Sequence, residues 1–221
     1  MNTYLRTVAA IAYKDLVVEW RTRETLVAGA VLALIVVAIF AFALELAPAT
    51  ARAVAPGLLW ATLAFAGVLT FGRLFAPERD RGSLDGLLLV PADPSALYVG
   101  KMASALLFML LVFVVTLPAL AVLTGAPLLT ASVLPVAVLG LLGLAAAGTL
   151  FAALALSGRA RDVLLPILFL PLSIPVVLTA AGATRLITDG APSGGALGVL
   201  AACDALYIAA STVLFPYVVE E

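Results

Sequence analysis

The sequence predicts an all-α integral membrane protein with six transmembrane helices and an amino-terminal helix at the membrane surface. Hydrophobic residues make up 64% of the 221 residues and charged residues only 11%, which is too little polar surface to cover a globule in water. The apolar runs are about 20 residues long, the length that crosses a roughly 30 Å hydrocarbon core. Charged residues separate the runs, so each span can be assigned in turn.

The positions of the charged residues and of the uncharged runs between them predict the first elements. Residues 1–24 mix apolar and charged side chains without glycine or proline, which predicts an interfacial helix with Glu19 and Arg23 as a favourable pair. Uncharged runs predict spans at 25–44 and 53–72. The uncharged stretch 102–158 is too long for one crossing at about 1.5 Å per residue. It must fold back at Gly125-Ala126-Pro127, giving spans at 102–123 and 131–156.

The third span has a clear beginning. Asp93 followed by Pro94 places an N-cap and a first-turn proline together, and we expect Lys101 to snorkel from this helix towards water. The fourth span carries small residues at helical spacing, which favour close packing either inside the subunit or between subunits. They are Gly140, Gly143, Ala147, Gly148 and Ala152.

The last two spans are expected at 163–184 and 197–219. Pro166, Pro171 and Pro175 each remove a backbone donor from the fifth span, which predicts a kinked or partly unwound helix, either for packing or as a moving hinge. Asp204 is the acidic residue inside the sixth span. It is expected one to two turns from the outer boundary, where it has either a transport role or a structural one.

Basic residues set the topology. With a cytoplasmic amino terminus, every Lys and Arg except Arg52 and Arg185 falls on the inner side, as the positive-inside rule requires. We therefore expect one multi-pass domain, residues 1–221, in the cytoplasmic (inner) membrane, with both termini in the cytoplasm. The basic residues form no stripe with interleaved aromatic residues, so nucleic acid is not expected as a partner.

The inner loop 73–101 contains the most informative motif. A charged cluster at Glu78, Arg79, Asp80 and Arg81 precedes Gly82 and Ser83, and the leucines at 84, 87 and 88 then share one helical face. Ser83 can cap this short amphipathic helix, and Asp85 lies in its first turn. The helix can dock on a soluble partner or lie on the lipid surface. The chain lacks a phosphate-binding loop, so ATP chemistry would come from a partner.

The inner loop and two further segments resemble those of known protein families. The pattern from Glu78 to Pro91, followed by Gly100-Lys101, is similar to the loop of permeases in the ABC-2 superfamily of ABC exporters. Ala55-Pro56-Gly57-Leu58-Leu59-Trp60 and the triple-proline segment 164–175 resemble the heme exporter protein B family, CcmB, over nearly the whole chain.

The resemblance implies an ABC-2 type exporter permease fold, a homodimeric membrane core and a separate ATPase, CcmA, that binds ATP. CcmC, CcmD and the heme chaperone CcmE are the further partners. ATP hydrolysis would drive heme export or release of the heme-loaded chaperone. The ATPase-coupling residues implied in this chain are Glu78, Arg79, Asp80, Gly82, Ser83, Leu84, Asp85, Leu87, Leu88 and Pro91, with Arg159, Arg161 and Asp162 as a second contact.

The membrane candidates are Asp204, Trp60, Pro166, Pro171 and Pro175. Histidine, the usual protein ligand of heme iron, is absent, so we expect heme to be transported or held by a partner, and neither heme nor a metal to be bound by this chain. One alternative is an ABC-2 permease that exports a lipid or a drug. An intramembrane enzyme is disfavoured because no nucleophile and base converge.

Overall fold

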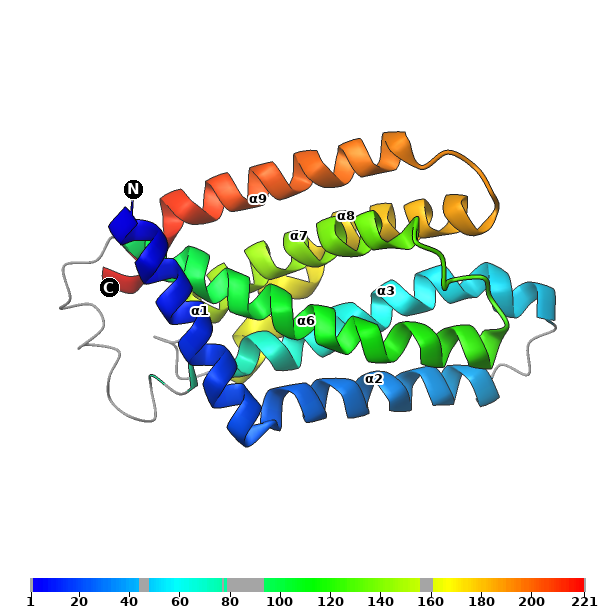
Figure 1. The fold of residues 1–221 in the computed structure, drawn as a ribbon, viewed down its shortest axis with the longest axis horizontal. Coiled ribbons are helices and arrows are strands. Elements are labelled where there is room, and N and C mark those ends of the chain that lie inside the picture. Colours follow the sequence, from blue (N-terminus) through cyan, green and yellow to red (C-terminus); the bar gives the residue numbers. More distant parts are fainter. Residues whose placement is uncertain (1, 44–47, 77, 79–93, 156–160, 221) are drawn as a thin grey trace.

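The computed structural model describes residues 2–43, 48–76, 78, 94–155 and 161–220. Across those ranges every regular element is an α-helix, which confirms the all-α class. The coupling helix expected between residues 79 and 93 lies outside the described residues. The helices are α1 (Asn2–Thr22), α2 (Glu24–Ala43), α3 (Pro48–Arg73), α6 (Pro94–Thr124), α7 (Val133–Leu154), α8 (Arg161–Thr188) and α9 (Gly194–Glu220), as Figure 1 shows.

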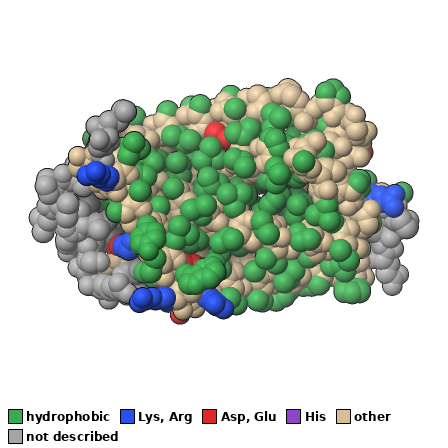
Figure 2. Space-filling model, in the orientation of Figure 1, with side chains coloured by type: hydrophobic (Ala, Val, Ile, Leu, Met, Phe, Trp, Pro, Cys, Tyr) green, Lys and Arg blue, Asp and Glu red, His purple; other side chains and the backbone are tan. Residues whose placement is uncertain are grey.

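Six of these helices, α2 to α9, are long and apolar enough to cross a bilayer, which confirms the predicted number of spans. They run side by side, whereas α1 crosses one end of the bundle, where α9 also ends (Figure 1). Hydrophobic side chains cover the face between the two ends in Figure 2, and lysine and arginine gather towards the ends. This distribution is the one expected when hydrocarbon surrounds the middle of the bundle.

The turns between the later helices follow the sequence signals. α6 ends at Thr124, and Gly125 takes the left-handed conformation (φ 64°) while its N–H bonds the carbonyl of Ala121 at 2.9 Å. This is the fold-back expected at 125–127, and glycine adopts it at little cost. Gly190, also left-handed (φ 74°), turns the chain after α8.

The start of α6 agrees with the sequence signal. The helix begins at Pro94, as its proline indicates, and continues through Lys101 into the apolar run. Asp93, the expected N-cap, lies outside the described residues. The structure buries the charge of Lys101 among partners instead of leaving it exposed.

α7 lies against three other spans through its glycines. A Cβ atom added at Gly140 would stand 2.3 Å from the Trp60 ring of α3, and one added at Gly148 would stand 2.3 Å from the Phe71 ring. Ala147 and Ala152 are buried as well. The small-residue surface of the fourth span therefore packs inside the subunit, which decides between the two interpretations of that pattern.

α8 is helical without interruption from Arg161 to Thr188, so its three prolines leave the helix wound. A kink, the other outcome expected at these prolines, stays a prediction. Hydroxyl groups bind carbonyls of this helix: Ser173 donates to Leu170 at 2.7 Å, and Tyr207 of α9 donates to Leu172 at 2.8 Å. Pro171 and Pro175 lie on the exposed face of α8, and the hinge stays a prediction.

Candidate functional site: a buried charge cluster at one end of the bundle

The cluster forms where α1 packs on the first third of α6. Gly100 makes the approach possible, because a Cβ atom there would lie 2.9 Å from Ile11 and 3.2 Å from the carbonyl oxygen of Val8. Contact with a backbone atom cannot be relieved by a side-chain rotation. Because residue 100 has no side chain, α1 packs directly against α6. The next residue, Lys101, then lies within reach of Asp15 on α1.

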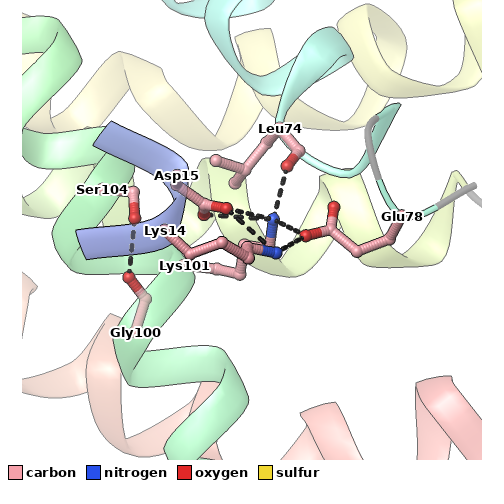
Figure 3. A network of polar contacts seen from close by, with 7 residues as sticks. All are labelled: Lys14, Asp15, Leu74, Glu78, Gly100, Lys101 and Ser104. Carbon is pink, nitrogen blue, oxygen red and sulfur yellow. Dashed lines mark hydrogen bonds and ion pairs between the residues drawn. The ribbon is translucent and has the colours of Figure 1, made fainter. Parts of the chain in front are cut away.

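Lys101 is the centre of the cluster and is 0% exposed. Its Nζ donates to Glu78 Oε1 at 2.8 Å, to Asp15 Oδ1 at 3.2 Å and to the carbonyl oxygen of Leu74, the residue after α3, at 2.9 Å (Figure 3). Three acceptors satisfy the three N–H donors of an ammonium group. The Phe75 ring, centred 5.0 Å away, adds a cation–π contact.

Lys14 neutralises the remaining negative charge. Its Nζ donates to Glu78 and lies 3.3 Å from Asp15 Oδ1, so two lysines face two carboxylates. Asp15 is 6% exposed and Glu78 is 2% exposed, whereas the Lys14 side chain is 43% exposed. Counted over these four described residues the charges balance, and Lys14 is the member that reaches the surface.

The electrostatics follow from this pairing. Burial raises the pKa of Glu78, but the charges and hydrogen bonds of Lys101 and then Lys14 outweigh it, so the pKa lies below its ordinary value. Burial lowers the pKa of Lys14, but the hydrogen bond to Glu78 and the charges of Asp15 and Glu78 leave it above its ordinary value. Both groups are therefore held in their charged forms at neutral pH.

The cluster joins three segments that are distant in the sequence. Asp15 belongs to α1, Leu74 directly follows α3, and Lys101 belongs to α6. Glu78 is the last described residue before segment 79–93, which contains most of the implied coupling residues. The Glu78 carboxylate joins Lys101 on α6 to Lys14 on α1.

Most of the sequence-predicted coupling residues cannot be placed. Arg79, Asp80, Gly82, Ser83, Leu84, Asp85, Leu87, Leu88, Pro91 and Arg159 lie outside the described residues. Arg161 and Asp162 form the first turn of α8, and their side chains also lie outside that description. Among the predicted coupling residues, Glu78 is therefore the one whose contacts the structure defines.

Sequence reasoning missed the partners of Glu78. We expected Lys101 to snorkel to water, but its ammonium group is buried and bound, because carboxylates from α1 and from residue 78 reach it. Asp15 and Lys14 were not singled out. Asp15 and Glu19 are one turn apart on a face that also carries Ile11, and an acid on an apolar face signals a buried partner.

The expected pair of Glu19 with Arg23 is not what the structure shows. Glu19 is buried and accepts a hydrogen bond from the Leu26 N–H at 2.8 Å, which satisfies a free donor in the first turn of α2. Arg23 has left-handed backbone geometry (φ 57°) between α1 and α2, and its guanidinium lies 5.9 Å from the Trp20 ring centre. The helix ends at Thr22, so Arg23 leaves the register that the pairing requires.

Two of the membrane candidates are buried within the bundle. Trp60 is enclosed, and its indole N–H donates to the Thr184 hydroxyl at 2.9 Å, which joins α3 to α8. Asp204 lies ten residues after the first residue of α9, Gly194, or about 15 Å along the helix axis. It is therefore near the middle of α9, and its distance from the membrane boundary stays a prediction.

No group of three or more potential metal ligands occurs in the part of the chain that the structure describes. The described residues of the candidate site instead form the ion pairs given above. Comparison with known proteins gives this arrangement its family context.

The family model described as "CcmB protein" matches residues 6–220. Heme exporter protein B of Pseudomonas aeruginosa is 33% identical over 176 residues, which cover 78% of each chain. Heme exporter protein B of Bradyrhizobium diazoefficiens is 29% identical over 196 residues, or 87% of each chain. The protein of the same name from Rhodobacter capsulatus is 32% identical over 157 residues, covering 71% of this chain and 72% of its own. With most of α1 and all six spans inside the matched range, the chain belongs to the CcmB protein family.

Proposed function

We propose that this chain is the membrane permease subunit of an ABC transporter for heme export and cytochrome c maturation. The family membership supports the transport system, since the relatives carry the name heme exporter protein B. The observation that carries the mechanism is the buried Lys101 cluster, which connects segment 79–93 to α1 and α6. The chain itself is proposed to be non-enzymatic, with ATP hydrolysis in a separate CcmA-like subunit.

In this mechanism the ATPase binds the segment Glu78 to Pro91 and displaces it during the cycle of ATP hydrolysis. Glu78 passes the displacement to Lys101, which is rigid within α6, and to α1 through Lys14 and Asp15. Ion pairs that are buried and hydrogen-bonded resist separation far more than exposed ones. The inner turn with Arg159, Arg161 and Asp162 is the proposed second contact of the ATPase.

The proposed orientation places the α1 end of the bundle in the cytoplasm and the chain in the inner membrane. The lysine and arginine residues at that end of the described chain include Lys14 and Arg73, whereas Arg52 and Arg185 belong to the opposite end. The proposed partners, beyond the ATPase, are a second membrane subunit in a dimeric core and CcmC-, CcmD- and CcmE-like heme-handling proteins.

Heme is proposed to be cargo or to be held by a partner, because a chain with no histidine lacks the usual ligand of heme iron. The purified chain should therefore give no defined axial-ligand spectrum when hemin is titrated into it. A tight complex with such a spectrum would contradict this part of the proposal.

A crosslinking experiment tests the coupling. In a Cys203→Ala background, the variants Leu84→Cys and Leu88→Cys are expected to crosslink to the ATPase subunit, while Ala131→Cys, at the opposite end, serves as the negative control. Labelling of residues 84 and 88 by lipid probes alone, without a crosslink to the ATPase, would overturn the coupling role.

A complementation experiment tests the transport system. The chain, expressed with its ATPase in a bacterium lacking its own heme exporter protein B, should restore covalently bound heme in c-type cytochromes. Restoration of lipid or drug export without cytochrome c would assign the permease to a different exporter.

A further inference from the structure

Asp204 is a buried acid that the coupling mechanism does not use. It is 3% exposed in the middle of α9, and neither carboxyl oxygen has a hydrogen-bond partner within the described part of the chain. Buried polar groups are almost always paired. A buried carboxyl group at this depth therefore needs an explanation beyond packing.

The carboxyl group fills a space provided by α7 and α8. A Cβ atom added at Gly143 of α7 would lie 2.6 Å from Asp204 Oδ1 and 3.1 Å from a methyl group of Val176 in α8. The acid is thus inserted where three helices meet, and glycine supplies the room for it. No donor among the described residues reaches the inserted oxygen.

No positive charge faces this carboxyl group from the described helices packed against it. α7 carries no ionisable residue, and the ionisable residues of α8 (Arg161, Asp162 and Arg185) lie near its ends. From α6, Lys101 is bound to the cluster and Tyr98 donates to the carbonyl of Ala146. Among the ionisable residues of α9, Cys203 adjoins the acid, Tyr207 donates to Leu172, and Tyr217 and Glu220 lie towards the far end.

We propose that Asp204 is a proton-binding site whose occupancy holds α9 against α7 and α8. A carboxylate without a counter-ion in a membrane interior is strongly unfavourable, whereas the neutral acid costs far less to bury. The packed arrangement is therefore that of the protonated side chain. When the carboxyl group releases its proton to water, the resulting carboxylate draws water in, and α9 separates locally from Gly143.

This inference does not depend on the ATPase or on the cargo. It concerns a contact about 15 Å inside α9, counted from Gly194, and remote from the Lys101 cluster at the other end of that helix (Figure 1). In the proposed exporter, it would make proton release accompany any movement that separates α9 from α7. The purified full-length chain is enough to test it.

The chain contains one cysteine, Cys203, which adjoins the acid and is half-buried. Its rate of labelling by a small maleimide reports local opening of α9. The rate is measured from pH 5 to pH 9 in detergent for the wild type and for Asp204→Asn, which has the same shape but no titration. Dividing one rate by the other removes the ionisation of the thiol itself.

The ratio of wild-type to Asp204→Asn labelling is expected to be close to one at low pH. It should then rise with pH, by up to about tenfold per pH unit, the limit for an opening that releases one proton. Asp189→Asn, a neutralised acid on the exposed surface, should keep the wild-type profile. A ratio that does not change with pH would overturn the proposal.

Stability gives a second readout. Asp204→Asn should unfold at the same temperature as the wild type at low pH and at a higher temperature at high pH, where the wild type must bury a charge or open. A variant that is less stable than the wild type at every pH would show that the carboxyl group serves as a structural acceptor, and would overturn the proposal.

Discussion

At the scale of single residues, the decisive feature is that Lys101 satisfies its ammonium group inside the protein rather than at the membrane surface. Three oxygen atoms accept from it within 2.8 to 3.2 Å: Glu78 Oε1, Asp15 Oδ1 and the Leu74 carbonyl oxygen. A buried ion pair contributes little over an apolar replacement, yet removal of one partner is costly because the other charge stays buried. The cluster therefore specifies which segments meet more than it adds stability.

Replacement of Lys101 by methionine should lower the free energy of unfolding by about 3–5 kcal/mol, because Asp15 and Glu78 then lose their buried counter-charge. Thermal or denaturant unfolding in detergent measures the loss. Lys14→Met is the matched control, and since the Lys14 side chain is 43% exposed, its loss should be smaller.

The triple variant Asp15→Asn, Glu78→Gln, Lys101→Met removes both signs of charge and should recover much of that stability. This account of the cluster would be contradicted if Lys101→Met and Lys14→Met lost the same free energy of unfolding. It would also be contradicted if the triple variant were less stable than Lys101→Met.

Stability should also depend on pH through Glu78. Its pKa is lowered from an ordinary value of 4.5, so its contribution is fully present above pH 4.5 and is lost as pH falls through the lowered value. The unfolding temperature of the wild type should therefore exceed that of Glu78→Gln at neutral pH, and the difference should shrink in acid. A difference that persists unchanged at the lowest pH would mean that ionisation of Glu78 is not its source.

At the scale of helices, glycines decide which elements can approach. Because Gly100 has no side chain, α1 can lie directly on α6. On α7, three glycines likewise leave space for side chains of other helices: Gly140 for Trp60, Gly143 for Asp204 and Gly148 for Phe71. Without a hydrophobic driving force between helices in lipid, close approach and side-chain hydrogen bonds such as Trp60 to Thr184 hold the spans together. Close contacts at the glycines and hydrogen bonds between side chains therefore fix the positions of these helices.

Replacement of Gly100 by alanine should loosen α1, because the new Cβ would stand 2.9 Å from Ile11 and 3.2 Å from a backbone oxygen. A loss of about 1–3 kcal/mol is typical of overpacking. Gly182→Ala is the matched control, since nothing lies within 4 Å of that position and alanine favours the helix. Faster limited proteolysis within α1 for Gly100→Ala, but not for Gly182→Ala, would support the prediction; equal protection would contradict it.

At the scale of the whole molecule, one end of the bundle gathers α1, the cluster and the end of α9, and the opposite end carries the turns at Gly125 and Gly190 (Figure 1). This polarity fits a permease that is driven from one side. It also means that a single determination of orientation locates every candidate coupling residue relative to the membrane.

Thiol labelling in cells can determine that orientation. In a Cys203→Ala background, Tyr13→Cys on the exposed side of α1 should react with a membrane-impermeant reagent only after the inner membrane is permeabilised, because we place that end in the cytoplasm. Ala131→Cys, exposed at the other end, should react once the periplasm is accessible. The reverse pattern would overturn the proposed orientation and, with it, the coupling role.

The sequence by itself determined the class of the protein, its six spans, the turn at Gly125 and its family resemblance, because hydrophobic length, charge placement and glycine are local properties of the chain. Only the tertiary structure decided that Lys101 is buried, that the glycines of α7 pack within the subunit and that Asp204, near the middle of α9, has no hydrogen-bond partner among the described residues. These facts depend on which side chains from distant segments meet. The burial cost of a charge depends on that neighbourhood, which no window of local sequence contains.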